Sequence, residues 1–147
     1  MANAALKALE DQRAQDEELV AIVENDACGV DAVQYLTGCT FGKGNLIFRD
    51  YGKSVYSFYH RATGKAVRVA AKPRSPSEQT REEMIQRWLS ASEADLVTVQ
   101  EVSIPTPEYA RIRASVTCAY CGERVMETRA RIREGKVACI PCAERKA

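Results

Sequence analysis

Two pairs of cysteines near the C-terminus constrain the fold of this chain more than any other feature of its sequence. Cys118 and Cys121 form one Cys-x-x-Cys pair, Cys139 and Cys142 form a second, and seventeen residues separate the pairs. This spacing is typical of a zinc site in which each pair binds the same ion through two thiolates. Because four cysteines leave no position for water, we expect one structural zinc ion. Four ordinary thiols or two disulfides are the alternative interpretations.

The same site explains how a short C-terminal segment can fold. Residues 111–147 are too few to bury a core of their own, since chains below about 40 residues usually need a metal or disulfides. Structural zinc contributes an apparent ~10–16 kcal/mol in finger peptides. Gly122 and Gly135 suit the tight turns of an intervening hairpin. We therefore predict a four-cysteine zinc-finger domain over residues 111–147.

Composition places the chain among globular proteins. Its 147 residues are 46% hydrophobic and 28% charged, which suits one domain of about 100 residues followed by the small lobe. No run approaches 18 apolar residues, and the start lacks the layout of a signal peptide. We expect a cytoplasmic protein without a membrane segment, in a compartment where disulfides are rare.

The net charge of +1 conceals an asymmetry along the chain. Residues 1–50 carry four basic and nine acidic groups, whereas residues 111–147 carry nine basic and four acidic groups. A zinc centre with four thiolates lowers the second balance from +5 to about +3. A basic lobe on an acidic body predicts an acidic partner surface or nucleic acid. The alternative is attraction between the two halves within a dimer.

Residues 1–104 read as an α+β domain with mixed helices and strands. Ser75-Pro76-Ser77-Glu78 is typical of a helix start with a capping box, and Ile104-Pro105-Thr106-Pro107 is a stiff connector to the lobe. The expected elements are a helix over 4–15, a strand over 19–24, a helix ending at Gly38, strands over 46–49, 54–59 and 66–70, a helix to about residue 91 with Met84, Ile85, Trp88 and Leu89 on one face, and a strand over 95–102.

Polar and small residues concentrate around the helix that ends at Gly38. Asp31, Gln34 and Thr37 are three apart, which predicts roughly one helical face. The structural alternative is a capped surface helix followed by a glycine loop, with Lys43 as a solvated charge. The candidate cofactor-binding residues of this region are Asp31, Gln34, Thr37, Cys39 and Lys43.

Two cysteines flank this helix and differ in their expected chemistry. Cys28 stands at the N-terminal end, where free N–H groups favour a thiolate. Cys39 stands beyond the other end, where the neutral thiol is favoured. Eleven residues at 1.5 Å each place them ~16 Å apart, too far for a disulfide or a shared metal. Cys28 is the candidate catalytic residue, as a nucleophile or thiolate ligand, and Cys39 is expected to pack or to support the loop.

Three segments, together with the cysteine pairs, resemble the E-subunit family of formylmethanofuran dehydrogenase over nearly the whole chain. The resemblance implies a compact α+β domain joined to a zinc finger, assembly as a homodimer, and association with molybdenum or tungsten formylmethanofuran dehydrogenase chemistry. The segments are Asp26-Ala27-Cys28-Gly29-Val30-Asp31-Ala32-Val33-Gln34, Thr37-Gly38-Cys39-Thr40-Phe41-Gly42-Lys43-Gly44-Asn45-Leu46 and Asp50-Tyr51-Gly52-Lys53.

The chain departs from the family at its start. Family members usually carry a His-x-Cys-Pro-Gly segment before the first helix, and nothing in this sequence matches it. The resemblance implies that this histidine and cysteine would lie near the counterpart of Cys28 and form a metal or redox site. Either the chain is truncated or this copy has lost the site; a first helix without a capping residue favours truncation. A second metal near Cys28 is expected only when the missing segment is supplied.

Three functions are consistent with these features. The first is a zinc-binding accessory subunit that docks on a larger molybdenum or tungsten metalloenzyme, and it is favoured over an independent enzyme. The second is a regulator that binds nucleic acid or RNA polymerase through its basic zinc lobe, since Cys-x-x-Cys-Gly-Glu followed by Cys-x-x-Cys resembles zinc fingers of such regulators. The third is a small thiol or metal enzyme centred on Cys28.

Overall fold

The chain folds into two compact units, Met1–Ala110 and Arg111–Ala147, in a computed structural model. The structure describes residues 1–73 and 80–145. From sequence, the first domain was expected over 1–104, whereas the first unit also includes the segment up to Ala110. Each unit is described by itself below.

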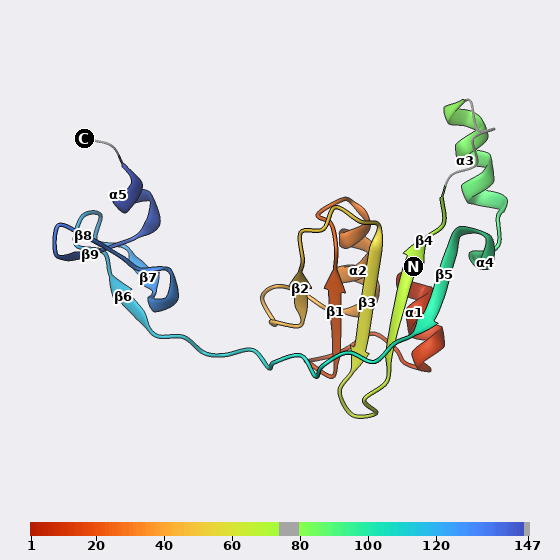
Figure 1. Ribbon diagram of the computed structural model, residues 1–147, viewed down its shortest axis with the longest axis horizontal. Coiled ribbons are helices and arrows are strands. Elements are labelled where there is room, and N and C mark those ends of the chain that lie inside the picture. The colour runs from red at the N-terminus through yellow and green to blue at the C-terminus, as the bar shows by residue number, and fades with distance from the viewer. Residues whose placement is uncertain (74–79, 146–147) are drawn as a thin grey trace. The chain divides into compact units, whose positions relative to one another are not determined.

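A five-stranded mixed sheet forms the centre of the first unit (Figure 1). Only the β1–β2 pair is parallel, and β3, β4 and β5 add antiparallel neighbours. The strand order is β2-β1-β3-β4-β5. With its helices the unit is α+β, as the sequence predicts. The strands are β1 Leu19–Val23, β2 Leu46–Phe48, β3 Val55–His60, β4 Ala66–Ala71 and β5 Val97–Glu101.

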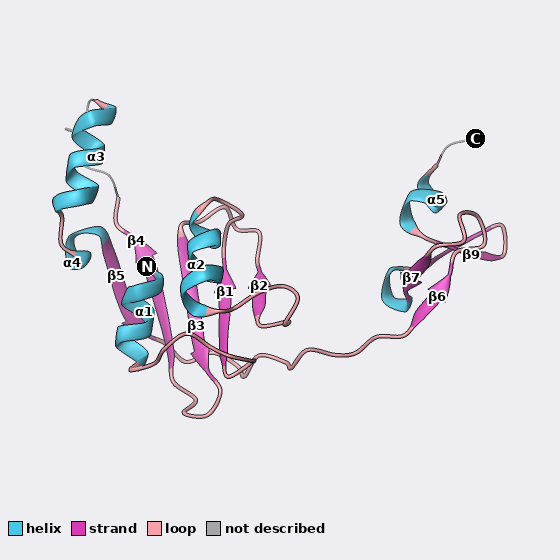
Figure 2. Ribbon diagram, turned by 180° about the vertical axis from the view of Figure 1, so that it is seen from behind, coloured by secondary structure: helices cyan, strands magenta, loops and turns pink. Residues whose placement is uncertain are grey.

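Helices α1 (Ala2–Leu9) and α2 (Gly29–Thr37) cover the same face of this sheet (Figure 2). Every residue of β1 is buried, because both of its faces are covered. Leu19, Ala21 and Val23 pack into the cluster beneath the helices, whereas Val20 belongs to a second cluster on the opposite face. This two-sided burial explains why β1 reads as a continuous apolar run.

The first helix is shorter than the predicted 4–15. It ends at Leu9, and Glu10 turns the chain with a positive φ of 56° while its backbone N–H bonds the last carbonyls of the helix. The following polar residues carry no apolar face that could hold a longer helix against the sheet. Instead, the Glu18 carboxylate accepts hydrogen bonds from the backbone N–H groups of Gln15 (2.6 Å) and Asp16 (2.9 Å).

Helix α2 ends at Gly38, as predicted from the sequence. Gly38 has a φ of 72°, and its N–H bonds the carbonyl of Gln34. A Cβ at this position would also meet the backbone carbonyl oxygen of Ala14. Both the left-handed conformation and the close approach of the two segments therefore require glycine.

The excursion between β4 and β5 carries two helices, α3 (Arg81–Ser90) and α4 (Glu93–Leu96). The predicted capping box at Ser75, Pro76 and Glu78 lies outside the described residues. The described part of α3 begins after Thr80, which forms its own capping box with Glu83. No residue of α3 is buried, and Ile85, Trp88 and Leu89 are exposed on its apolar face.

The start of β5 also differs from the sequence prediction. A strand was expected over 95–102, but Ser92 and Asp95 form a capping box that starts α4 instead. The strand begins at Val97, after this short helix. The hydrogen bond between the Asp95 side chain and the Ser92 backbone thus favours a helical turn at residues 95 and 96, where the sequence pattern alone favours a strand.

Arg61 fastens the segment after β5 to the first unit. Its guanidinium donates to the carbonyl oxygens of Glu17 (2.8 Å), Pro107 (2.6 Å) and Glu108 (2.9 Å), and it lies 3.8 Å from the centroid of the Tyr109 ring. The Arg61 side chain is only 6% exposed. Residues up to 110 are consequently part of the folded domain and not a free connector.

The second unit consists of two short hairpins and a C-terminal helix. A turn at Glu134 and Gly135, both with positive φ, joins β8 to β9. The glycine turn predicted here is therefore present, with Lys136 as the first residue of β9. The elements are β6 Ser115–Thr117, β7 Arg124–Met126, the 3-10 turn η1 Glu127–Arg129, β8 Arg131–Arg133, β9 Lys136–Ala138 and α5 Ile140–Glu144.

No helix among residues 1–73 and 80–145 has the length and apolar character needed to cross a membrane.

Candidate functional site

The four C-terminal cysteines converge within the second unit. Cys118 and Cys121 flank the turn between β6 and β7, and Cys139 and Cys142 flank the start of α5. Their sulfur atoms all lie within 4.8 Å of one another. Cys118, Cys139 and Cys142 are buried, and together with Ala138 they form the core of the unit. The predicted grouping of these cysteines is therefore present in the structure.

The spacing of the sulfurs matches tetrahedral coordination. Metal–sulfur bonds of about 2.3 Å place the sulfurs of a tetrahedron about 3.8 Å apart. The Sγ atoms of Cys121 and Cys139 are 3.8 Å apart, far beyond the length of a disulfide bond. All four thiols are free. The residues present fit a metal ion, and an all-cysteine donor set is typical of zinc.

Backbone N–H groups favour the thiolate form of Cys118, which is the form that binds a cation. The N–H of Cys139 donates to the Cys118 sulfur at 3.3 Å, and this bond, with the N–H groups of Cys121 and Tyr120, lowers the pKa of Cys118 to about 6. Hydrogen bonding to Cys139, followed by burial, raises the pKa of Cys142 to about 12. At neutral pH the cluster thus holds thiolate and thiol together, and a bound metal displaces the remaining protons.

Arg133 and Tyr120 link the first hairpin, the second hairpin and the last helix. The guanidinium of Arg133 donates to the carbonyl of Cys142 at 2.7 Å and lies 5.3 Å from the Tyr120 ring centroid. The Tyr120 hydroxyl in turn donates to the Arg133 carbonyl at 2.8 Å. These contacts help to hold the two cysteine pairs close to each other. The buried core of the unit nevertheless consists mainly of cysteines.

A second candidate site is a pocket at the N-terminal end of α2 in the first unit. Its volume is about 230 Å³. Cys28, Asp31 and Gln34 line it together, so the structure unites three of the residues predicted from the sequence. Cys28 is exposed and occupies the N-cap position of α2 without a side-chain capping bond. Its sulfur is consequently available to a molecule in the pocket.

Tyr56 and Asn25 support the floor of this pocket. The Tyr56 hydroxyl donates to the Asn25 side chain at 3.4 Å, and Asn25 donates to the carbonyl of Lys53 at 2.9 Å. Burial, and then the nearby charge of Cys28, raise the pKa of Tyr56 above its ordinary value. A methyl group on Gly29 would meet the Tyr56 hydroxyl, so this glycine permits the close approach of α2 to β3.

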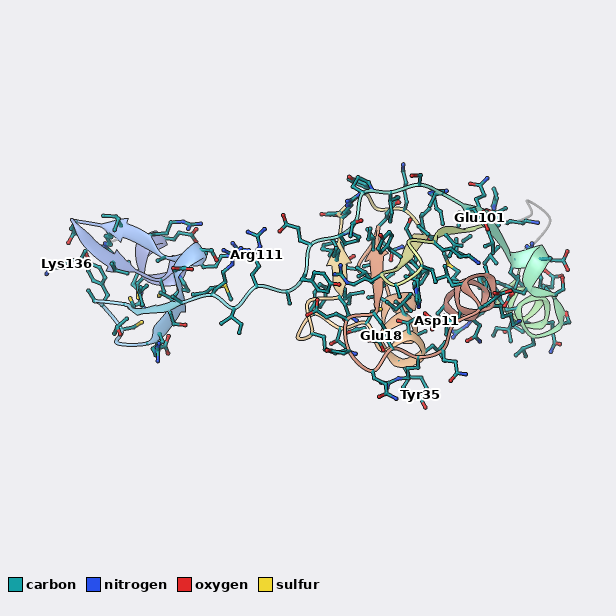
Figure 3. All side chains as sticks on the ribbon, turned by 90° about the horizontal axis from the view of Figure 1, so that it is seen from below. Asp11, Glu18, Tyr35, Glu101, Arg111 and Lys136 are labelled. Carbon is teal, nitrogen blue, oxygen red and sulfur yellow. The ribbon has the colours of Figure 1, made fainter. Side chains whose placement is uncertain are left out.

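The other predicted binding residues do not line the pocket. Thr37 is fully buried and its hydroxyl donates to the Val33 carbonyl at 2.7 Å. Six residues turn an α-helix by about 600°, which leaves Thr37 about 120° around the axis from Asp31. The expectation of one shared face therefore fails at Thr37. Tyr35, in contrast to Thr37, points away from the domain (Figure 3).

Cys39 and Lys43 have structural roles. Cys39 is fully buried, its thiol donates to the Leu19 carbonyl at 3.3 Å, and burial raises its pKa. It packs in the core, as expected. The ammonium of Lys43 donates to the carbonyl oxygens of Ala14, Gln15 and Asp16 at 3.2–3.4 Å. Lys43 thus stabilises the loop before β1, and not a ligand in the pocket.

Sequence reasoning did not single out seven of the residues that line the pocket, namely Val23, Asn25, Asp26, Ala27, Val30, Phe41 and Phe48, nor Tyr56, which bonds Asn25 without lining the pocket. Phe41 stands in the glycine-rich loop after α2, where no core strand or helix explains an aromatic residue. That signal was available in the sequence. Phe48 and Tyr56 read as ordinary strand residues, so no sequence signal distinguishes them. Among the described residues, the four C-terminal cysteines form the only group of three or more metal-ligating side chains.

An α+β domain with a small pocket, followed by a four-cysteine lobe, defines a small protein with a metal-binding module. A family model described as "FmdE, Molybdenum formylmethanofuran dehydrogenase operon" matches residues 1–128. The chain therefore belongs to the FmdE family, as its sequence motifs suggested.

A solved structure and a curated protein share this similarity. The crystal structure of an FmdE-like protein of tungsten formylmethanofuran dehydrogenase type from Syntrophus aciditrophicus matches with a TM-score of 0.65 and 25% identity, over 98% of this chain and 79% of that one. A "Probable S-adenosyl-L-methionine-binding protein" of Archaeoglobus fulgidus is 30% identical over 155 aligned positions. The alignment covers 86% of this chain but only 41% of that longer relative.

Proposed function

We propose that this chain is a zinc-binding accessory protein of the FmdE family that docks on a molybdenum or tungsten oxidoreductase. The observation that carries this proposal is the cluster of four sulfurs within 4.8 Å of one another in a unit of its own. Four thiolate ligands saturate a tetrahedral zinc ion, so the metal shapes the lobe and offers no position for a substrate. The description of the matching family supports an oxidoreductase of the formylmethanofuran dehydrogenase kind as the partner.

An accessory role is favoured over independent catalysis by the position of the one histidine. His60 accepts a hydrogen bond from the backbone N–H of Thr63 at its Nδ1, and its Nε2 lies 3.5 Å from an Asp11 carboxylate oxygen. It does not line the pocket that contains Cys28. A thiol nucleophile ordinarily needs a neighbouring base. We also propose a cytoplasmic location, because a reducing compartment keeps thiols available for zinc.

Binding to the purified catalytic subunits of a molybdenum or tungsten formylmethanofuran dehydrogenase tests this function. We expect the zinc-loaded chain to form a complex in isothermal titration calorimetry, and the Cys121→Ser variant to bind more weakly. A Ser115→Ala variant, altered at an exposed residue outside the cysteine cluster, is the matched control and should bind like the parent chain. Absence of any complex with the zinc-loaded parent would refute the docking proposal.

A nucleic-acid-binding regulator is the second candidate, and the charge of the zinc lobe favours it. Six arginines of the described lobe are exposed, namely Arg111, Arg113, Arg124, Arg129, Arg131 and Arg145. Contacts to phosphates make affinity fall steeply with salt. A gel-shift assay with duplex DNA and RNA at low salt distinguishes this candidate: a salt-sensitive complex supports it, and no shift removes it.

We further propose that the chain forms a homodimer, as the family resemblance implies. The apolar face of α3 supports this proposal, since Trp88 and Leu89 are 54% and 78% exposed. Two copies of this face would bury side chains that are costly to leave in water. Sedimentation equilibrium of the parent and of Leu89→Glu tests the idea. The parent should sediment as a dimer and the variant as a monomer; a monomeric parent contradicts the proposal.

A further inference from the structure

The pocket at the start of α2 has walls of two kinds. Apolar side chains of Val23, Val30, Phe41 and Phe48 form one part, and polar side chains between Asn25 and Gln34 form the other. Ligand pockets typically combine apolar walls with a few converging polar groups. At about 230 Å³ this one is below the usual range of about 300–1,000 Å³. It therefore suits a compact molecule or a single head group.

The two phenylalanines are the first indication of the ligand's chemistry. Phe41 is 61% exposed and Phe48 is 40% exposed, although the domain buries its other phenylalanine, Phe58, completely. They come from different elements, the loop after α2 and the end of β2, yet they border the same hollow. Exposed aromatic faces attract cations through their negative quadrupole. Neither ring is needed to fill the core.

The charges at the pocket are the second indication. Asp26 and Asp31 both line the pocket and are exposed. Among the described residues, no lysine, arginine or histidine lines it. The two carboxylates therefore give the pocket a negative potential. A negative potential and aromatic surface in one small cavity disfavour anions and favour a positively charged ligand with apolar substituents.

We propose that this pocket binds a small organic cation, an alkylated ammonium head group, between the carboxylates of Asp26 and Asp31 and the rings of Phe41 and Phe48. The alkyl groups contact the rings and the exposed sulfur of Cys28, and the positive charge faces the carboxylates. Asn25, fixed by its bonds to Lys53 and Tyr56, keeps the floor of the pocket in place. This site is independent of the zinc lobe and of the proposed docking function.

Titration of the zinc-loaded full chain with choline, followed by amide chemical shifts, tests the proposal. The control ligand is 3,3-dimethylbutan-1-ol, which has the shape of choline without its charge. We expect saturable shifts at the amides of residues 25–31 and about tenfold tighter binding of choline, since one cation–π contact and one exposed ion pair each contribute about 2- to 5-fold. Equal binding of the two compounds, or no saturable shift with choline, would overturn the proposal.

Matched variants locate the effect. Asp31→Asn and Phe41→Leu are each expected to weaken choline binding by about 2- to 5-fold. At exposed positions outside the pocket, Asp50→Asn removes a carboxylate charge and Tyr35→Leu removes an aromatic ring, and both should leave choline binding unchanged. Because all four residues are exposed, the variants should retain the parent's spectrum elsewhere. If the controls weaken binding as much as the pocket variants, choline binds elsewhere and the assignment is wrong.

Discussion

Replacing Arg61 by alanine should loosen the segment that follows β5. The guanidinium donates three hydrogen bonds, of 2.6–2.9 Å, to the carbonyl oxygens of Glu17, Pro107 and Glu108. Hydrogen bonds from charged groups contribute about 1.5–3 kcal/mol each, but water can reach the surface carbonyls when the side chain is removed. Counting about 1 kcal/mol for each bond, we expect Arg61→Ala to lower the free energy of unfolding by about 3 kcal/mol.

Urea unfolding followed at the amides of β3, combined with hydrogen exchange, measures this effect. The amide of Ala110, which donates to the Glu17 carboxylate at 3.1 Å, should exchange faster in the variant. Arg13→Ala is the matched control, because Arg13 makes one exposed bond, to the Tyr35 carbonyl at 2.9 Å. It should cost about 1 kcal/mol or less. If Arg61→Ala costs no more than Arg13→Ala and leaves exchange at Ala110 unchanged, the reasoning is refuted.

Three further perturbations test individual features of the first unit. Gly38→Ala should destabilise the domain by more than Gly52→Ala. Both glycines have positive φ, which costs an alanine about 1–2 kcal/mol, but only at Gly38 would a Cβ also meet a backbone carbonyl. Equal losses of stability in thermal unfolding would contradict this reasoning. Hydrogen bonds from backbone N–H groups lower the pKa of Glu18, so its carboxylate stabilises the fold above the unfolded pKa of about 4.3 and loses that effect as the pH falls through the lower folded pKa. Glu18→Gln should therefore be less stable than the parent at pH 7, with a difference that vanishes near pH 2; a constant difference would oppose this assignment. Thr80→Ala should reduce the helicity of α3 by removing its capping bond, worth about 0.5–2 kcal/mol, and unchanged α3 chemical shifts would show that the cap is dispensable.

Local patterns in the sequence predicted the cysteine cluster and most strands. Cys-x-x-Cys spacing is dictated by the geometry of one ion and two thiolates, so it can be recognised without knowledge of the surrounding fold. The apolar run of β1 reflects burial of the strand on both faces, and the glycine after α2 reflects the left-handed backbone that ends the helix. Both signals lie within a few neighbouring residues. The cysteine cluster and the sheet strands could therefore be anticipated before the structure was known.

Features that depend on distant backbone atoms could not be read from the sequence. Arg61 bonds carbonyl groups 44–47 residues away, and every residue has a carbonyl, so no residue type marks these partners. The position of Thr37, by contrast, could have been predicted, because six residues of helix place it about 120° around the axis from Asp31. Phe48 lines the Cys28 pocket, and Tyr56 bonds the lining residue Asn25, only because β1 lies between β2 and β3 in the sheet, a pairing that local patterns leave open.

The dependence of the second unit on its four cysteines is the central claim of this account. Metal analysis of the purified chain, with amide spectra before and after chelation, tests it most directly. We predict one zinc ion per chain, and loss of dispersed amide signals from residues 115–142 on chelation while signals of the first unit persist. A second unit that stays ordered without metal, or a chain purified with no metal and a folded lobe, would contradict the account.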